Sequence, residues 1–158
     1  MRNVVAVRID ERLIHGQVMT SWMKLYSPTS ILIIDSASAK NPFLSRILFA
    51  AAPKNVELHV FDEESAAAFL GEESESGERL MVLSKTPGPL LKVMGEGVMF
   101  PEIILGNMGG APGRRRFNKN ISASDAEIED YRAIESAGTP IFCQMVPSDS
   151  KESIASLL

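Results

Sequence analysis

The chain has 158 residues, 45% of them hydrophobic and 23% charged, which suits one folded domain with a core and is short for two. Its formal net charge of -4 argues against nucleic acid as the main partner, because nucleic-acid-binding domains are expected to be basic. With one cysteine, Cys143, and two histidines, the chain cannot form an internal disulfide and is poorly supplied for a zinc site.

Targeting signals are not visible in the sequence. The N-terminus lacks a signal peptide's basic-then-apolar pattern, and no apolar run is long enough to cross a bilayer. We therefore expect a cytoplasmic protein.

Short apolar runs at even spacing predict strands along the chain. Several are continuous rather than alternating, which is typical of strands covered on both faces. The predicted strands are 4–9, 30–35, 56–61, 79–84, 102–107 and 140–146.

Helix signals separate these runs. The first helix is predicted over 16–26, and a second begins after Asn41 as N-cap and Pro42 as first residue. Asp62 can cap the next helix, and Pro87 or Pro89 can open another. The last two helices are predicted over 124–138, with a Ser124/Glu127 capping box and an ending glycine, and over 150–158.

The alternation of strand and helix predicts an α/β fold in one domain, residues 1–158. We expect an open, mainly parallel, twisted sheet with helices on both faces. Segment 108–123, "MGGAPGRRRFNKNISA", breaks the pattern because it is rich in glycine and charge. It is predicted to be a loop or a small antiparallel excursion.

The segment "RIDERLIHGQV", residues 8–18, places His15 where the first strand gives way to the first helix. Ligands of open α/β sheets bind beyond the carboxyl ends of the strands. The helix begins near Gly16 and Gln17, and its first N–H groups can receive an anion. Arg8 and Arg12 add permanent positive charge with a geometry suited to phosphoryl oxygens.

The same surroundings disfavour a protonated His15, so we expect a neutral imidazole near pH 7. A neutral imidazole beside an anion cradle is a nucleophile that can take a phosphoryl group. Three roles are open to Asp10: it can orient the His15 ring, cap the helix or pair with an arginine.

The stretch from Arg8 to Val18, together with Trp22, resembles the signature of the B component (enzyme IIB) of the mannose/fructose/sorbose family. This family is part of the bacterial phosphoenolpyruvate-dependent sugar phosphotransferase system (PTS). The resemblance covers nearly the whole chain. Further similar segments are "SKTP" (84–87), "GNMGG" (106–110) and residues 120–150. Within the family, "KTP", "GNM" and "VP" resemble the N-acetylgalactosamine/galactosamine branch.

This resemblance implies an open α/β fold and phosphotransferase activity. The histidine that matches His15 accepts a phosphoryl group from a phosphohistidine of the A component. It passes the group to a sugar held by the membrane components C and D, so the protein would associate peripherally with the permease. The arginine that matches Arg12 holds phosphoryl oxygens. The first and fourth strands lie side by side in the family, which would bring Ser84, Lys85 and Thr86 near the His15 loop.

Such transfer needs positioning and charge stabilisation, so no metal or other cofactor is expected. A homo-oligomer is compatible with the sequence. A histidine-phosphatase-like hydrolase is an alternative, but it needs a second active-site histidine, and His59 lies inside a predicted strand. A non-catalytic adaptor for phosphoproteins is a second alternative.

The run Arg114 to Arg116 has two open roles, docking an acidic partner or forming a solvated loop.

Overall fold

The computed structural model describes residues 1–16 and 19–158; Gln17 and Val18, inside the first helix, are outside the described residues. Seven of the described strands form one sheet in the order β3-β2-β4-β1-β5-β8-β9. All neighbours are parallel except β8 and β9 at the edge. The strands are β1 (Val4–Asp10), β2 (Ser30–Ile34), β3 (Glu57–Phe61), β4 (Leu80–Ser84), β5 (Ile103–Asn107), β8 (Ile141–Cys143) and β9 (Glu152–Ser153).

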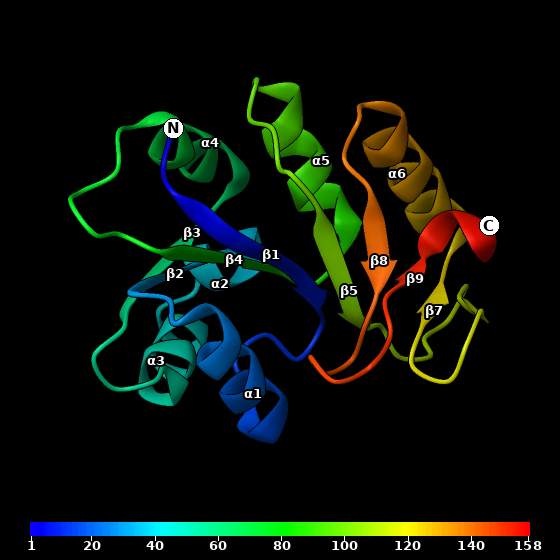
Figure 1. Cartoon of the computed structure of the whole chain (residues 1–158), viewed down its shortest axis with the longest axis horizontal. Coiled ribbons are helices and arrows are strands. Elements are labelled where there is room, and N and C mark those ends of the chain that lie inside the picture. Colours follow the sequence, from blue (N-terminus) through cyan, green and yellow to red (C-terminus); the bar gives the residue numbers. More distant parts are fainter.

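Helices cover both faces of this sheet (Figure 1). On one face, α1 (Gly16–Tyr26) and α3 (Pro42–Ala51) contribute to an apolar cluster around Trp22, Ile33 and Leu83. On the other, α4 (Glu63–Gly71), α5 (Pro87–Gly95) and α6 (Asp125–Ser136) pack over a second cluster. The short helix α2 (Ser36–Lys40) precedes α3. The predicted open α/β sheet with helices on both faces is therefore confirmed.

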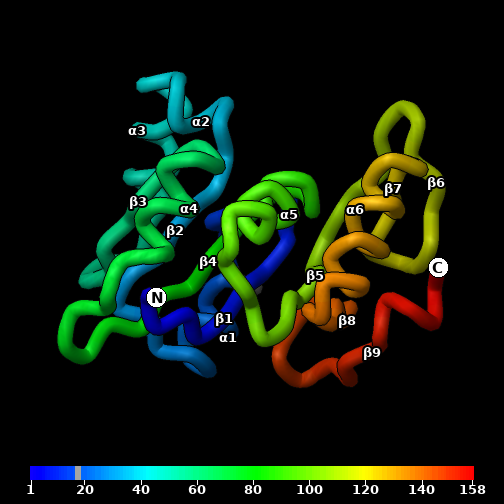
Figure 2. Tube along the Cα trace, turned by 90° about the horizontal axis from the view of Figure 1, so that it is seen from above, coloured from blue at the N-terminus to red at the C-terminus, as the bar shows by residue number. Residues whose placement is uncertain are grey.

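The glycine- and arginine-rich segment forms the small antiparallel excursion that the sequence predicts. Strands β6 (Arg115–Arg116) and β7 (Ser122–Ala123) pair antiparallel. Figure 2 shows this hairpin at the end of the molecule opposite α3 and β3. None of the described helices has the length and apolar character that crossing a membrane requires.

Local signals placed most elements correctly. The Asn41 side chain accepts from the amides of Phe43 and Leu44. The Ser124/Glu127 capping box is present at α6. Helix α2 was not predicted, because "SASAK" has no apolar periodicity; it depends on Asp35, whose side chain accepts from the Ser38 amide.

The predicted last helix over 150–158 is wrong. Strand β9 pairs with β8, and a single 3-10 turn follows over Ile154–Ser156. The Ile154 side chain is buried in the core cluster of the α4–α6 face. One buried anchor in so short a segment is satisfied by a tight turn, without the several turns that a helical stripe needs.

Candidate active site

The first loop leaves the carboxyl end of β1 through a tight turn. The Leu13 amide donates to the Asp10 carbonyl at 2.9 Å. Leu13 has a φ of 55° and a buried side chain, so a leucine occupies the left-handed region at a cost of about 1–2 kcal/mol. Such strain persists where the surroundings hold the residue in place, and it gathers at functional sites. The turn delivers His15 to the start of α1.

Arg8 lies inside the molecule, with only 3% of its side chain exposed. Its Nη1 donates to the carbonyl of Gln144 at 3.1 Å and its Nη2 to the carbonyl of Met145 at 2.9 Å. The guanidinium lies over the Trp22 ring, 4.7 Å from the ring centroid. Burial lowers the pKa of Arg8, and the charge of Asp10 opposes that shift.

Gly106 in β5 makes this burial possible. A methyl group at Gly106 would lie 2.0 Å from Arg8 Nη2. Trp22 Nε1 donates to the same Met145 carbonyl at 3.1 Å. Trp22 and Arg8 therefore both hold the loop that follows β8. The Arg8 guanidinium therefore brings together two residues that are far apart in sequence, Trp22 and Gly106, the first glycine of "GNMGG".

Asp10 is the centre of the site and is 2% exposed. Its Oδ1 accepts from the Arg12 amide and from Arg12 Nε, both at 3.0 Å, and its Oδ2 accepts from Arg12 Nη2 at 2.9 Å. Burial alone would raise the pKa of Asp10. The hydrogen bonds from Arg12 and the charges of Arg12 and Arg8 outweigh burial and lower that pKa. Of its three open roles, the pairing with arginine is present in the structure.

Arg12 is the accessible arginine, with 37% of its side chain exposed. Its Nη2 also contacts the Met145 sulfur at 3.5 Å. Among the described residues, Arg12 Nη1 makes no hydrogen bond. The guanidinium is thus fixed by Asp10 on one side and has a donor left for a ligand oxygen.

His15 lies beside Asp10 and is the N-cap residue of α1. Its Nε2 is 3.5 Å from Asp10 Oδ2, and a quarter of its side chain is exposed. Within the described residues no hydrogen bond from the His15 side chain caps the helix. His15 and Gly16 border a hollow of about 410 Å³ that also touches Ile14, Met19 and the end of α3. A reacting group can therefore reach the ring and the positive end of α1 together.

Strand β4 lies beside β1, but Ser84, Lys85 and Thr86, the predicted contacts of the His15 loop, interact with other residues. The register pairs Ser84 with Ile9. The Ser84 hydroxyl donates to the Thr86 carbonyl at 2.8 Å, and Lys85 Nζ is 3.4 Å from Asp35. None of the described interactions joins these residues to His15. The predicted role of Gln17 falls outside the described residues.

A brace between the site loop and α6 was not predicted. Glu11 accepts from the Gly109 amide at 2.7 Å and from Arg114 at 3.0 Å, and Arg114 also pairs with Glu127 at 2.8 Å. Arg114 is therefore not part of a solvated loop. Arg115 remains exposed, 3.9 Å from Asp125. The one sequence signal of this close approach is Gly109, a glycine just after a strand end. The structure shows why a glycine fits there: a methyl group at Gly109 would lie 2.6 Å from Glu11.

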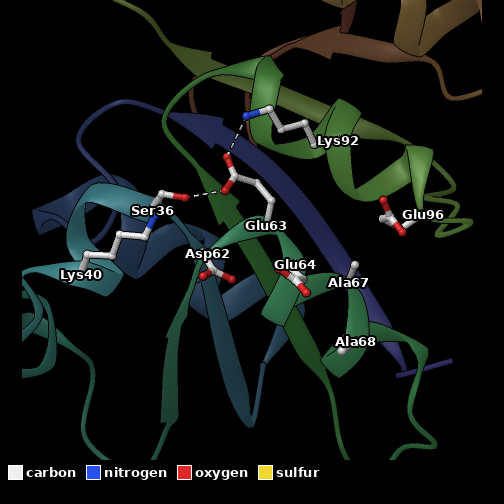
Figure 3. Close-up of a pocket in the computed structure, with 9 residues that line it drawn as sticks. All are labelled: Ser36, Lys40, Asp62, Glu63, Glu64, Ala67, Ala68, Lys92 and Glu96. Carbon is white, nitrogen blue, oxygen red and sulfur yellow. Dashed lines mark hydrogen bonds and ion pairs between the residues drawn. The ribbon is translucent and has the colours of Figure 1, made fainter.

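A larger hollow, of about 780 Å³, lies between α2, α4 and α5 (Figure 3). Glu63 occupies its centre, accepting from the Ser36 hydroxyl and lying 3.5 Å from Lys92 Nζ. Further carboxylates, Asp62, Glu64 and Glu96, line the wall. These four carboxylates, counting Glu63, outnumber Lys40 and Lys92 in the lining, so the hollow is less suited to a phosphoryl group than the His15 hollow.

His59 lies on β3, which β2 and β4 separate from β1. Its ring contacts Phe61 and Phe69, and its Nε2 is 3.4 Å from Glu57. The second histidine that a histidine phosphatase needs is therefore not supplied by His59. Among the described residues no group of three His, Cys, Asp or Glu side chains is arranged to hold a metal ion.

The chain matches a sequence profile of a known family over residues 4–158, described as "PTS system sorbose subfamily IIB component". It is 25% identical over 158 residues to the fructose-specific EIIB component of Bacillus subtilis (strain 168), covering all of this chain and 97% of that one. It is 28% identical over 151 residues to the mannose-specific EIIAB component of Escherichia coli (strain K12), covering 96% of this chain. The chain spans 47% of that longer protein.

The solved structures agree with the sequence relatives. The IIBSor domain of the sorbose permease from Klebsiella pneumoniae superposes with a TM-score of 0.91 at 27% identity. The match covers 99% of this chain and 95% of that domain.

Proposed function

Because the chain belongs to the sorbose subfamily of PTS IIB components, we propose that it is a phosphocarrier that uses His15. His15 accepts a phosphoryl group from a phosphohistidine of the A component. It then transfers the group to a sugar bound by the membrane components C and D during uptake. The observation that carries the proposal is one accessible imidazole at the start of α1, in contact with the Asp10 carboxylate that holds Arg12.

The geometry assigns separate roles to the two ring nitrogens. Nε2 faces Asp10, so we infer that it keeps its proton and that Nδ1 attacks phosphorus. The Nδ1–P bond forms while the N–P bond of the donor imidazole breaks, and that imidazole is the leaving group. The phosphorylated ring is positively charged while Nε2 keeps its proton, and the Asp10 carboxylate stabilises that charge.

The phosphoryl oxygens need donors on the side of attack. Arg12 supplies a guanidinium that Asp10 already orients. The Gly16 amide lies at the positive end of α1, and the role predicted for Gln17 stays a prediction. Buried Arg8 acts through its neighbours, holding the Met145 carbonyl and the charge of Asp10. Ser84, Lys85 and Thr86, at the end of the neighbouring strand, stay predicted secondary contacts.

The partners follow from the family. One relative is named an EIIAB component, which supports an A component as the phosphoryl donor. The acceptor is the sugar in the permease, so this protein would work in the cytoplasm at the membrane face. Neither metal nor cofactor enters the transfer as proposed. The branch specific for amino sugars remains a prediction.

The test is the intact mass of the protein after incubation with phosphoenolpyruvate, the general phosphotransferase proteins and a matching A component. We expect the gain of one phosphoryl group, its loss in acid, and no gain for His15→Ala. NMR of the phosphorylated imidazole should show phosphorus on Nδ1. Phosphate on His15→Ala would refute the assignment. Binding of the A component without covalent phosphate would favour the adaptor, and release of inorganic phosphate from phosphorylated compounds would favour the hydrolase.

A further inference from the structure

Helix α3 exposes an unusual amount of apolar surface. None of its residues is buried, and Phe43, Ile47 and Phe49 are 68%, 51% and 53% exposed. The helix is nevertheless well anchored, because Asn41 caps it and Leu48 packs against the core cluster of the α1 face. Contiguous large apolar side chains on a protein surface mark interaction sites more often than scattered ones do.

This apolar surface is continuous with the candidate active site. Ala51, the last residue of α3, and Pro53 line the same hollow as His15, Met19 and Met23. Figure 1 shows α1 and α3 on the same side of the sheet. We call the group Met23, Phe43, Ile47 and Ala51 the α1–α3 surface. A partner that covers His15 also covers this surface.

The charge around the α1–α3 surface is positive although the whole chain is acidic. From Arg12 to Val56 the only carboxylate is Asp35, which caps α2 and pairs with Lys85. Lys24, Arg46 and Lys54 are exposed there. The opposite face is acidic, since α4 and α6 carry Glu63, Glu64, Asp125, Glu127, Glu129, Asp130 and Glu135.

We propose that the α1–α3 surface docks the protein that delivers the phosphoryl group, and that this donor presents an apolar patch with an acidic rim. The inference rests on the proposed function of His15. Transfer requires the attacking nitrogen of His15 to come within about 3–3.5 Å of the phosphorus on the donor histidine, so the donor must cover the residues around His15. Between donor and acceptor, the positive rim favours the donor, which carries an anionic phosphohistidine, whereas a sugar is neutral.

The two parts of the surface act differently. Large apolar side chains at the centre of an interface carry most of the binding energy, which assigns Phe43 and Ile47 as anchors. Charges at the rim raise the association rate and its salt dependence, which assigns Arg46 and Lys54 as steering groups.

The experiment compares two phosphoryl donors on the double variant Phe43→Ser/Ile47→Ser. One donor is the phosphorylated A component at subsaturating concentration; the other is phosphoramidate, a small molecule that needs no docking surface. We expect kcat/KM for the A component to fall at least tenfold while the phosphoramidate rate is unchanged. Met99→Ser, an exposed apolar residue beyond α5, is the matched control and should leave both rates unchanged.

A second arm tests the rim. Arg46→Glu/Lys54→Glu should slow transfer from the A component and weaken its dependence on ionic strength, whereas Lys119→Glu in the β6–β7 turn should change neither.

An unchanged rate from the A component overturns the docking proposal, as does an equal fall with phosphoramidate. Normal transfer from the A component with lost transfer to sugar in membrane vesicles would assign the surface to the permease instead and also overturn it. Failure of the wild-type protein to accept phosphate on His15 from either donor would refute the proposed function itself.

Discussion

Replacing Gly106 with alanine tests how firmly the Arg8 guanidinium is held behind the His15 loop. The added methyl group would lie 2.0 Å from Nη2, 2.4 Å from Cζ and 2.9 Å from Nη1 of Arg8. All three contacts are far inside van der Waals distance. The guanidinium must move, and because it is buried it cannot move into water.

The cost follows from what Arg8 gives up. Its hydrogen bonds to the carbonyls of Gln144 and Met145 measure 3.1 and 2.9 Å, and both are charge-assisted. A hydrogen bond to a charged group contributes about 1.5–3 kcal/mol, so losing one or both gives a destabilisation of about 1.5–6 kcal/mol. In a chain of this size that lowers the melting temperature by roughly 3–24 °C.

The assay is thermal unfolding of Gly106→Ala beside Gly110→Ala. A methyl group at Gly110 meets nothing within 4 Å, so this control in the loop after β5 should unfold near the wild-type temperature. In an Arg8→Ala background the extra cost of Gly106→Ala should largely disappear, because the two residues are in contact. Equal melting temperatures for Gly106→Ala and Gly110→Ala would refute the close approach of Arg8 to β5.

Further predictions concern charge and burial. Burial opposes ionisation of Asp10, but hydrogen bonds and charge from Arg12 prevail and lower its pKa, so it stabilises the fold above about pH 4. The stability difference between wild type and Asp10→Asn in urea should shrink as the pH falls below that value; a constant difference would contradict the lowered pKa. Burial raises the pKa of Cys143 to about 12, so Ellman's reagent at pH 8 should label the native thiol far more slowly than the unfolded one. Arg114→Gln should lower the free energy of unfolding by about 1–3 kcal/mol through its two carboxylate partners, against almost nothing for exposed Arg115→Gln.

Local patterns in the sequence were sufficient for most of the fold. Continuous apolar runs marked the buried parallel strands, and caps such as Asn41 and Ser124 marked helix starts, because these signals lie within a few residues of the elements they define. The position of His15 at the carboxyl edge followed from the same reasoning. The helix predicted for the tail around Ile154 was wrong, because the conformation of the tail depends on the contact of Ile154 with a distant part of the core.

Long-range contacts were the part that sequence could not supply. Glu11 and Arg114 lie 103 positions apart, and Arg8 and Gln144 lie 136 apart. An arginine in a sequence is most simply interpreted as a surface charge, since unpaired arginines are rarely buried. Only the fold shows that Arg8 and Arg114 are internal supports, and that Arg12 is the accessible guanidinium.

The charge balance of the site fits a carrier that must release what it binds. Arg8 and Arg12 bring two positive charges and ionised Asp10 removes one, so a single positive charge remains beside His15. Two unpaired guanidiniums would hold a phosphoryl group tightly in the intermediate and slow the second transfer, whereas no positive charge would disfavour its arrival. Asp10 thus performs two tasks with one carboxylate: it fixes Arg12 in position and moderates the affinity of the cradle. The buried position of Asp10 serves both tasks, because water does not screen its interactions there.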